Sequence, residues 1–357
     1  MNILGIETSC DETAASVVTD GRKVLSNVVA SQIKFHSKYG GVVPELAARE
    51  HLNAIEHVVD EALDSAEFAI SDLDAVAVTN GPGLIPSLLV GLNFARGLAA
   101  SHKLPLIGVN HFMAHIYGSF LENRTGEVDD KATFPIVALV VSGGHTAIVL
   151  VGNDGSAKLV GTTLDDAAGE ALDKAAKMLG LGYPGGPVIE KMAKNGNPAK
   201  FAFPRSLTGA AGKALDKKDR FNFSFSGVKT ALYYHCKKYA ESGAGPIEGE
   251  LLFDTIASYQ EAVTDVLAKK TFAAADAFSA KSVLLCGGVA CNSLLRSKFQ
   301  KRAGDKMKLI ISEPKFCTDN AAMVAGMASK LLAKGKTDRI DIDAYSRLPA
   351  FEKIPFI

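Results

Sequence analysis

The feature that most restricts the fold of this chain is an order of strands and helices that occurs twice. Near the start, runs of apolar and β-branched residues predict three strands, at residues 2–7, 13–18 and 24–29. A helix then begins at Pro44, since proline suits a first helical turn, and Leu52, Ile55 and Val59 form its apolar face. After it come a strand at 74–79, a helix at 87–101, a strand at 105–109 and a helix at 111–121.

The same order begins again after a polar stretch at 122–133, which we interpret as a linker. Three strands are predicted at 135–141, 146–151 and 157–161, and later a strand at 282–286, a helix at 292–299, a strand at 308–311 and a helix at 319–332. The mostly helical residues between them, about 165–280, are expected to be an insertion.

Two copies of this order predict an α/β fold with the duplicated ribonuclease-H-like lobes of the actin, Hsp70 and sugar-kinase superfamily. We assign residues 1–130 to the first lobe and 131–333 to the second. The tail, about 334–357, is expected to pack back on the first lobe. Ligands of such α/β sheets bind beyond the carboxyl ends of the strands, here in the cleft between the lobes.

Composition excludes several classes of protein. With 357 residues, 47% of them hydrophobic, and no net charge, the chain is not a disordered one. Five cysteines without a Cys-x-x-Cys pair do not predict a disulfide framework or a zinc knuckle. No signal sequence or membrane-length apolar run is present, so we expect a cytoplasmic protein without a membrane partner. The zero charge gives no overall sign of a nucleic-acid binder, although it can hide a local basic face.

Two predicted hairpins end in residues that suit ligand binding. The first strand runs into Glu7, Asp11 and Glu12, and its counterpart in the second lobe runs into Ser142, Gly143 and Gly144. Glycines let a ligand approach the backbone, and successive N–H groups can bind an anion. Either end alone is better explained as an ordinary turn, but their matching positions favour a shared site.

Further glycine-rich turns occur at 81–83, 185–186 and 287–288. The turn at 287–288 joins a strand to a helix, an arrangement that directs N–H groups toward a phosphate. The chain has no Walker phosphate loop, because Lys330 stands where the first glycine before Gly335-Lys336-Thr337 would be.

His111 and His115 lie four residues apart on a predicted helix, so their side chains share one face and can bind one metal ion. No glutamate follows His111, which excludes the zinc-protease signature. Two ordinary buried histidines remain the alternative. A third ligand has to come from elsewhere: Asp319 is a candidate, with a helix N-cap as its alternative role, and His145 is a plausible neighbour.

Taken together, these residues resemble a known family, the universal tRNA N6-adenosine threonylcarbamoyltransferases, once catalogued as O-sialoglycoprotein endopeptidases, in their bacterial form. The resemblance extends over nearly the whole chain. Its segments are GIETSCDET at 5–13, GGVVPELA at 40–47, GPGL at 81–84, VSGGHT at 141–146, DDAAGE at 165–170, YPGGP at 183–187, FSFSG at 223–227, GGV at 287–289 and CTDN at 317–320. Two departures are Met113-Ala114, where the family often has Glu-Gly, and a segment at 209–220 that is longer than in many bacterial members.

The resemblance implies the functional residues. His111, His115 and Asp319 would bind one iron or zinc ion, and Glu12 would lie close to the reaction. An adenylate site would be lined by Val140, Val141, Ser142, Gly143, Gly144, Asp173, Gly186 and Asn292. Implied partners are tRNA, a paralogous protein of the same fold and a small ATPase.

The activity that the resemblance implies is transfer of threonylcarbamoyl from threonylcarbamoyl-AMP to N6 of the adenosine beside the anticodon, in tRNAs that read codons beginning with A. Two alternatives on the same fold are a small-metabolite kinase and a non-catalytic ATP-binding scaffold. A kinase would place ATP phosphates and Mg²⁺ at the two hairpin ends, but it has no use for the histidine pair.

Overall fold

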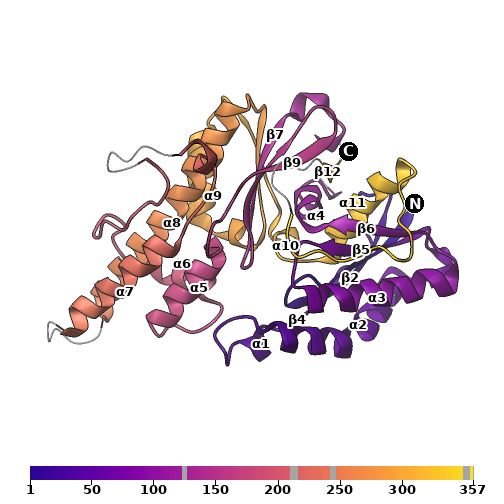
Figure 1. The fold of residues 1–357 in the computed structure, drawn as a ribbon, viewed down its shortest axis with the longest axis horizontal. Coiled ribbons are helices and arrows are strands. Elements are labelled where there is room, and N and C mark those ends of the chain that lie inside the picture. The colour runs from indigo at the N-terminus through magenta and orange to yellow at the C-terminus, as the bar shows by residue number, and fades with distance from the viewer. Residues whose placement is uncertain (123–126, 210–215, 242–246, 349–353, 357) are drawn as a thin grey trace.

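The computed structural model describes residues 1–122, 127–209, 216–241, 247–348 and 354–356, and it contains two mixed β-sheets (Figure 1). The first has the order β3-β2-β1-β5-β6, with β4 also paired to β2, and the second has the order β11-β10-β7-β8-β9-β12. In each sheet the central strand pairs antiparallel with the next strand of the chain and parallel with a later one. The twofold repeat predicted from the sequence is therefore present.

The strand bounds follow the predictions closely. The strands of the first sheet are β1 Asn2–Glu7, β2 Glu12–Thr19, β3 Lys23–Val24, β4 Val28–Ser31, β5 Ala75–Gly81 and β6 Leu106–Asn110. Those of the second are β7 Ile136–Val141, β8 Thr146–Val151, β9 Ser156–Thr162, β10 Ser282–Cys286, β11 Lys308–Ile311 and β12 Ile354–Pro355. The single strand expected at 24–29 is wrong, because β3 and β4 are separate. The Ser26 hydroxyl accepts the Val17 N–H between them, in place of a backbone carbonyl.

The helices are α1 Ile33–His36, α2 Pro44–Ala66, α3 Ile85–His102, α4 His111–Gly118, α5 Ala168–Met178, α6 Gly185–Ala193, α7 Ser226–Glu241, α8 Gly249–Ala277, α9 Ser293–Ala303, α10 Pro314–Cys317 and α11 Ala321–Ala333. Helix α2 begins at Pro44, as predicted, and Ile55 and Val59 are buried. The place of Leu52 on the apolar face is wrong, because Leu52 is 65% exposed. The region expected to be a helical insertion contains α5 to α8. Its long helix α8 packs on the outer face of the second sheet, which is the place that α2 has on the first sheet.

The helices and sheets pack in layers, which explains why the sequences of these helices and strands are rich in apolar residues. Helices α2 and α3 cover the outer face of the first sheet, and α8 and α9 cover that of the second. Helix α6 packs on α8 and α5 packs on α6, which extends the same core. Between the sheets, α4 and α11 share one core with the inner faces of both (Figure 1). Helix α4 contacts strands of both sheets, and α11 packs on β1 and β2, so closely that a Cβ on Gly5 would lie 2.4 Å from the Ala321 carbonyl oxygen.

The C-terminal residues return to the first sheet and then reach the second. Asp338 donates its N–H to the Leu106 carbonyl, Tyr345 donates to Asn80, and β12 pairs with β9. The lobe boundaries at 130 and 333 remain predictions. Residues 123–126 of the expected linker and 210–215 of the segment 209–220 lie outside the described residues. Across the described ranges, no helix has both the length and the apolar character that a bilayer crossing requires.

Candidate metal centre and nucleotide cavity

A cavity of about 410 Å³ lies where the ends of the two central strands face each other. It is lined from the first part of the chain by Cys10, Asp11, Glu12, Gly40, Gly41, Val42, Pro44 and Leu84, and from the second by Ser142, Gly143, Gly144, His145, Glu170, Asp173, Lys174, Tyr183, Gly288, Thr318 and Asp319. The two predicted hairpin ends therefore contribute to one space. Its size is within the range of small-ligand sites.

Helix α4 carries the two predicted histidines, which are not part of the lining but lie behind it, next to Asp319 of the cavity wall. It begins directly after β6, and the Asn110 side chain accepts hydrogen bonds from the N–H groups of Phe112 and Met113 as an N-cap. His111 and His115 are buried, and their ring centroids lie 4.6 Å apart. The four-residue spacing thus brings both imidazoles to one face, as predicted.

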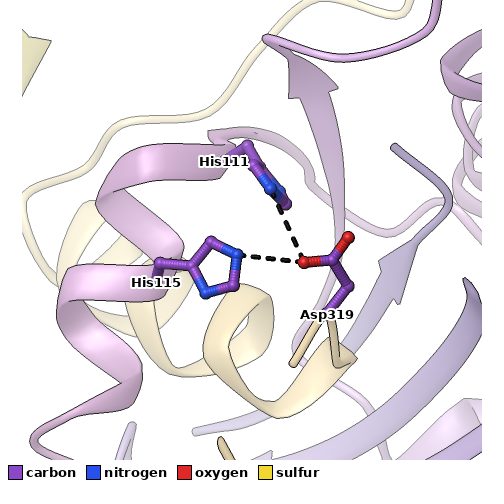
Figure 2. A group of neighbouring side chains, drawn as sticks. All are labelled: His111, His115 and Asp319. Atoms are coloured by element: carbon purple, nitrogen blue, oxygen red, sulfur yellow. Dashed lines mark hydrogen bonds and ion pairs between the residues drawn. The ribbon is translucent and has the colours of Figure 1, made fainter. Parts of the chain in front are cut away.

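Asp319 completes the cluster from the turn between α10 and α11 (Figure 2). Its Oδ1 lies 3.0 Å from His115 Nε2 and 3.7 Å from His111 Nε2. Asp319 is not the N-cap of α11, which was its alternative role. The neighbouring Asn320 is the cap, and its side chain accepts the Met323 N–H. Asp319 is therefore available to the histidines.

Glu7 is a buried member of this cluster to which the sequence analysis gave no separate role. Its carboxylate accepts hydrogen bonds from the Ser9 N–H and the Thr79 hydroxyl, both at 2.6 Å, and lies 3.2 Å from His111 Nδ1. With the Nδ1 proton donated to Glu7, His111 presents its Nε2 lone pair toward Asp319. Only the position of Glu7 at the end of a buried strand could have indicated this role.

The charges of the cluster are mutually dependent. Burial by itself raises the pKa of Glu7, but the neighbouring His111 brings that pKa below its ordinary value. Burial likewise lowers the pKa of His111, and Glu7 and Asp319 together raise it. The pKa of Asp319 lies well below its usual range, since the attraction of His111 and His115 exceeds the effect of burial.

The donor atoms fit a divalent transition metal. Atoms of His111, His115 and Asp319 that can act as ligands all lie within 4.8 Å of one another. Two imidazoles and one carboxylate form a donor set that iron and zinc both accept, and Glu7 is the kind of carboxylate that orients a metal-bound histidine. His115 Nδ1 is buried and has no hydrogen-bond partner among the described residues. The other ring nitrogen, Nε2, is the one that faces the Asp319 carboxylate.

The wall of the cavity beside this cluster is acidic. Burial, and then the neighbouring Asp11 and Asp319, raise the pKa of Glu12 to about 9, and the Ser31 hydroxyl lies 3.2 Å from its Oε1. His145 faces the cluster from the second hairpin, with its ring 5.4 Å from that of His111. Burial, and then the charge of His111, lower its pKa to about 3, so His145 is neutral at pH 7.

The opposite wall is the glycine turn of the second hairpin. A Cβ added to Gly143 or Gly144 would meet no atom within 4 Å, so both glycines face open space. The first turn of α5 packs against this turn: a Cβ on Gly169 would lie 2.6 Å from the Ser142 carbonyl oxygen. The turn is uncharged and leaves room for a ligand against its backbone.

The other predicted nucleotide-site residues divide into two groups. Asp173 lines the cavity and accepts hydrogen bonds from the N–H groups of Gly185 and Gly186, at 2.7 and 3.4 Å; burial nevertheless raises its pKa. Val140, Val141, Gly186 and Asn292 are not part of the lining. The two valines are buried in β7. Asn292 caps α9 by accepting the Leu295 N–H and donates to the Gln260 side chain.

Comparison with known proteins gives a consistent result. A family model described as tRNA N6-adenosine threonylcarbamoyltransferase matches residues 23–326. A protein of that name from Syntrophus aciditrophicus is 51% identical over 350 residues, which are 98% of each chain. Another from Syntrophotalea carbinolica is 49% identical over 98% of this chain and 97% of its own.

Two solved structures share the fold at low sequence identity. HypF from T. kodakarensis is 16% identical, with a TM-score of 0.57 over 93% of this chain and 48% of its own. Component A of the (R)-2-hydroxyglutaryl-CoA dehydratase of Acidaminococcus fermentans is 15% identical, with a TM-score of 0.52 over 93% and 99%. These likenesses confirm the predicted fold class and carry no information about the reaction.

Proposed function

The chain belongs to the tRNA N6-adenosine threonylcarbamoyltransferase family, and on this premise we propose that it transfers threonylcarbamoyl from threonylcarbamoyl-AMP to N6 of the adenosine beside the anticodon of tRNA. The observation that carries the proposal is the cluster of His111, His115 and Asp319, whose member Asp319 lines a cavity that glycine turns also border. The kinase alternative is not favoured, because the relatives that cover the whole chain bear the transferase name.

We place one metal ion, iron or zinc, at His111, His115 and Asp319, with Glu7 holding His111. A bound metal there would polarise the donor and offset negative charge on it. Three protein ligands would leave further coordination positions of the metal open to the donor.

The donor is proposed to lie across the cavity, with its phosphate at Ser142, Gly143 and Gly144 and its nucleoside toward Asp173, Gly186 and Asn292. The open space over the two glycines and the buried carboxylate of Asp173 support this orientation. The backbone N–H groups of the glycine turn would bind the phosphate, and Asp173 would accept hydrogen bonds from ribose hydroxyls. Val140 and Val141, whose side chains are buried, would act through their backbone.

The reaction needs an activated donor, since the lone pair of an exocyclic adenine amine is delocalised into the ring. The N6 nitrogen would attack the carbonyl carbon, the new C–N bond would form, and the bond from carbon to the phosphate oxygen would break. AMP would leave with that electron pair, and N6 would lose one proton. Because its pKa is raised to about 9, Glu12 is protonated at pH 7 and does not accept this proton, which would pass to solvent. Glu12 lines the cavity and is our candidate for a hydrogen-bond donor to the reactants.

We extend the proposal to two protein partners, a paralogue of the same fold and a small ATPase, and to action in the cytoplasm. The zero net charge supports a need for partners, because a chain without excess positive charge attracts a polyanion weakly at long range.

The test is a transfer assay with preformed threonylcarbamoyl-AMP, unmodified tRNA, this chain and the two partner proteins. We expect modified adenosine in digested tRNA by mass spectrometry, and release of one AMP for each modification. An absence of modified nucleoside would contradict the proposal. Transfer of phosphate from ATP to a small metabolite by the same preparation would favour the kinase.

A further inference from the structure

The zero net charge of the chain conceals a strong division of charge along it. Residues 1–130 contain 8 Lys and Arg against 17 Asp and Glu, a net charge of −9, and residues 131–357 contain 31 against 22, a net charge of +9. A polyanion is therefore repelled by most of the first part and attracted by the second. An RNA substrate that reaches the cavity needs lysine or arginine side chains beside it, from either part of the chain.

A second cavity, of about 290 Å³, adjoins the first and shares Gly40, Asp173 and Tyr183 with it. Its other lining residues are Ser37, Lys38, Tyr39, Lys177, Gly180 and Gly182. The volume is at the lower end of small-ligand sites and suits a single nucleotide, not a duplex.

The two cavities differ in charge. The first is lined by Asp11, Glu12, Glu170, Asp173 and Asp319 against a single lysine, Lys174. The second has two lysines, Lys38 and Lys177, and one acid, the shared Asp173. Both lysines are exposed, and neither forms an ion pair with a carboxylate of the described residues. Their ammonium groups are thus available to an anion.

The second cavity is built from both parts of the chain. Lys177, on α5, donates a hydrogen bond of 3.2 Å to the backbone carbonyl of Tyr39, in the segment between α1 and α2. Gly40, at φ +71°, packs against the same lysine side chain. An ammonium group has three donors, so Lys177 can keep this contact and bind a phosphate as well.

Aromatic rings complete the arrangement. The Tyr39 side chain is 58% exposed beside Lys38, and Tyr183 lies at the junction of the two cavities. Exposed aromatic rings interleaved with lysines are the usual platform for single-stranded nucleic acid, since bases stack on the rings while the ammonium groups bind phosphates.

We propose that the second cavity binds the nucleotide next to the reacting adenosine in the substrate RNA, with Lys38 and Lys177 on its phosphates and Tyr39 stacked on its base. This inference rests on the proposed function, because it takes tRNA to be the acceptor. The reacting adenosine enters the first cavity above Glu12, and the neighbouring nucleotide keeps the strand at the junction with Tyr183.

The test measures binding of an unmodified anticodon stem-loop RNA to the purified full-length chain by fluorescence anisotropy, from about 50 to 200 mM salt. Lys38→Glu should weaken binding about tenfold, and Lys177→Gln should reduce the slope of log affinity against log salt by about 0.7, the value for one phosphate of a single strand. Tyr39→Ala should weaken binding and Tyr39→Phe should preserve it, because phenylalanine retains the stacking ring.

The matched control is Lys301→Glu, which makes the same charge change at an exposed residue of α9 outside both linings. A loss of RNA affinity for Lys301→Glu equal to that for Lys38→Glu would overturn the proposal, as it would show a nonspecific charge effect. The proposal would also be overturned if Lys38→Glu lost as much affinity for AMP as for the RNA, because the second cavity would then belong to the donor. If the unaltered chain binds the RNA through these residues but transfers nothing, the proposed function fails and the RNA site stands.

Discussion

The two hairpins that meet at the main cavity have the same place in their sheets and opposite chemistry. The first hairpin carries Glu7 at the end of β1, Asp11 in the turn and Glu12 at the start of β2, and β1 ends against the buried histidines. The turn between β7 and β8 carries Ser142, Gly143 and Gly144 and is uncharged. The same framework therefore occurs twice, and we infer that its two copies serve different parts of the site. Through Glu7 the first hairpin holds the metal ligand His111, and the second hairpin binds the phosphate of the donor.

The largest effect is expected on the acidic side, from His115→Ala. Its loss removes one of three ligands, and a donor carbonyl displaced by even about 1 Å can lose about 100-fold in rate. We expect transfer to tRNA to fall at least about 100-fold, measured with preformed threonylcarbamoyl-AMP and tRNA in the presence of the partner proteins. The matched control is His102→Ala, at an exposed histidine at the end of α3. Equal activity of both variants would remove His115 from the site.

An intermediate effect is expected on the glycine side, from Gly144→Val. The added side chain would enter the space where the phosphate is proposed to lie, since nothing else is within 4 Å of a Cβ there. We expect AMP affinity to fall about tenfold by calorimetry, equivalent to about 1.4 kcal/mol. Gly97→Val, at a glycine of α3 that also faces open space, is the control. Unchanged AMP affinity in Gly144→Val would place the phosphate elsewhere.

The smallest effect is expected from an ion-pair cluster in the second part of the chain, where Asp166 binds Lys174 and Lys229. Burial raises the pKa of Asp166, but the two lysines lower it overall. Its ionised form therefore stabilises the fold above the ordinary pKa of 3.8, and this contribution is lost as the pH falls through the lower value of the folded state. Asp166→Asn should cost at most about 1 kcal/mol in free energy of unfolding at pH 7, because solvent screens the pairs.

Urea unfolding at pH 7 and pH 3.5 checks this prediction. The difference between Asp166→Asn and the unaltered chain should shrink at the lower pH. Asp305→Asn, at an exposed residue that forms no ion pair with the described residues, is the control and should behave like the unaltered chain. A difference that grows at pH 3.5 would contradict the assigned sign, and a loss of metal in Asp166→Asn would connect this cluster to the site.

A feature of the structure could be predicted from the sequence when the residues that determine it lie close together in the chain. The start of α2 at Pro44 and the shared face of His111 and His115 are local features, and both were predictable from spacing. The cap of α11 by Asn320 is also local, but two neighbouring side chains compete for it, and only the fold shows that Asp319 turns toward the histidines.

The contact between Glu7 and His111 joins residues 104 positions apart. It arises because β1 and β6 lie in one sheet, and no spacing in the sequence indicates it. The same is true of Lys177 and the Tyr39 carbonyl, 138 positions apart, which close the second cavity. Residues that recur with a period were therefore predictable, and pairs formed by packing of distant elements were not.

The central claim is that the metal is bound at the histidine cluster beside the first hairpin and the donor phosphate at the glycine turn of the second hairpin. Metal content tests this claim most directly. Elemental analysis should be carried out on the unaltered chain, His115→Ala and Gly144→Val, purified side by side. We predict about one iron or zinc per chain in the first, loss of most of it in His115→Ala, and retention of all of it in Gly144→Val. Equal metal in all three, or its loss from Gly144→Val, would contradict this division between the histidine cluster and the glycine turn.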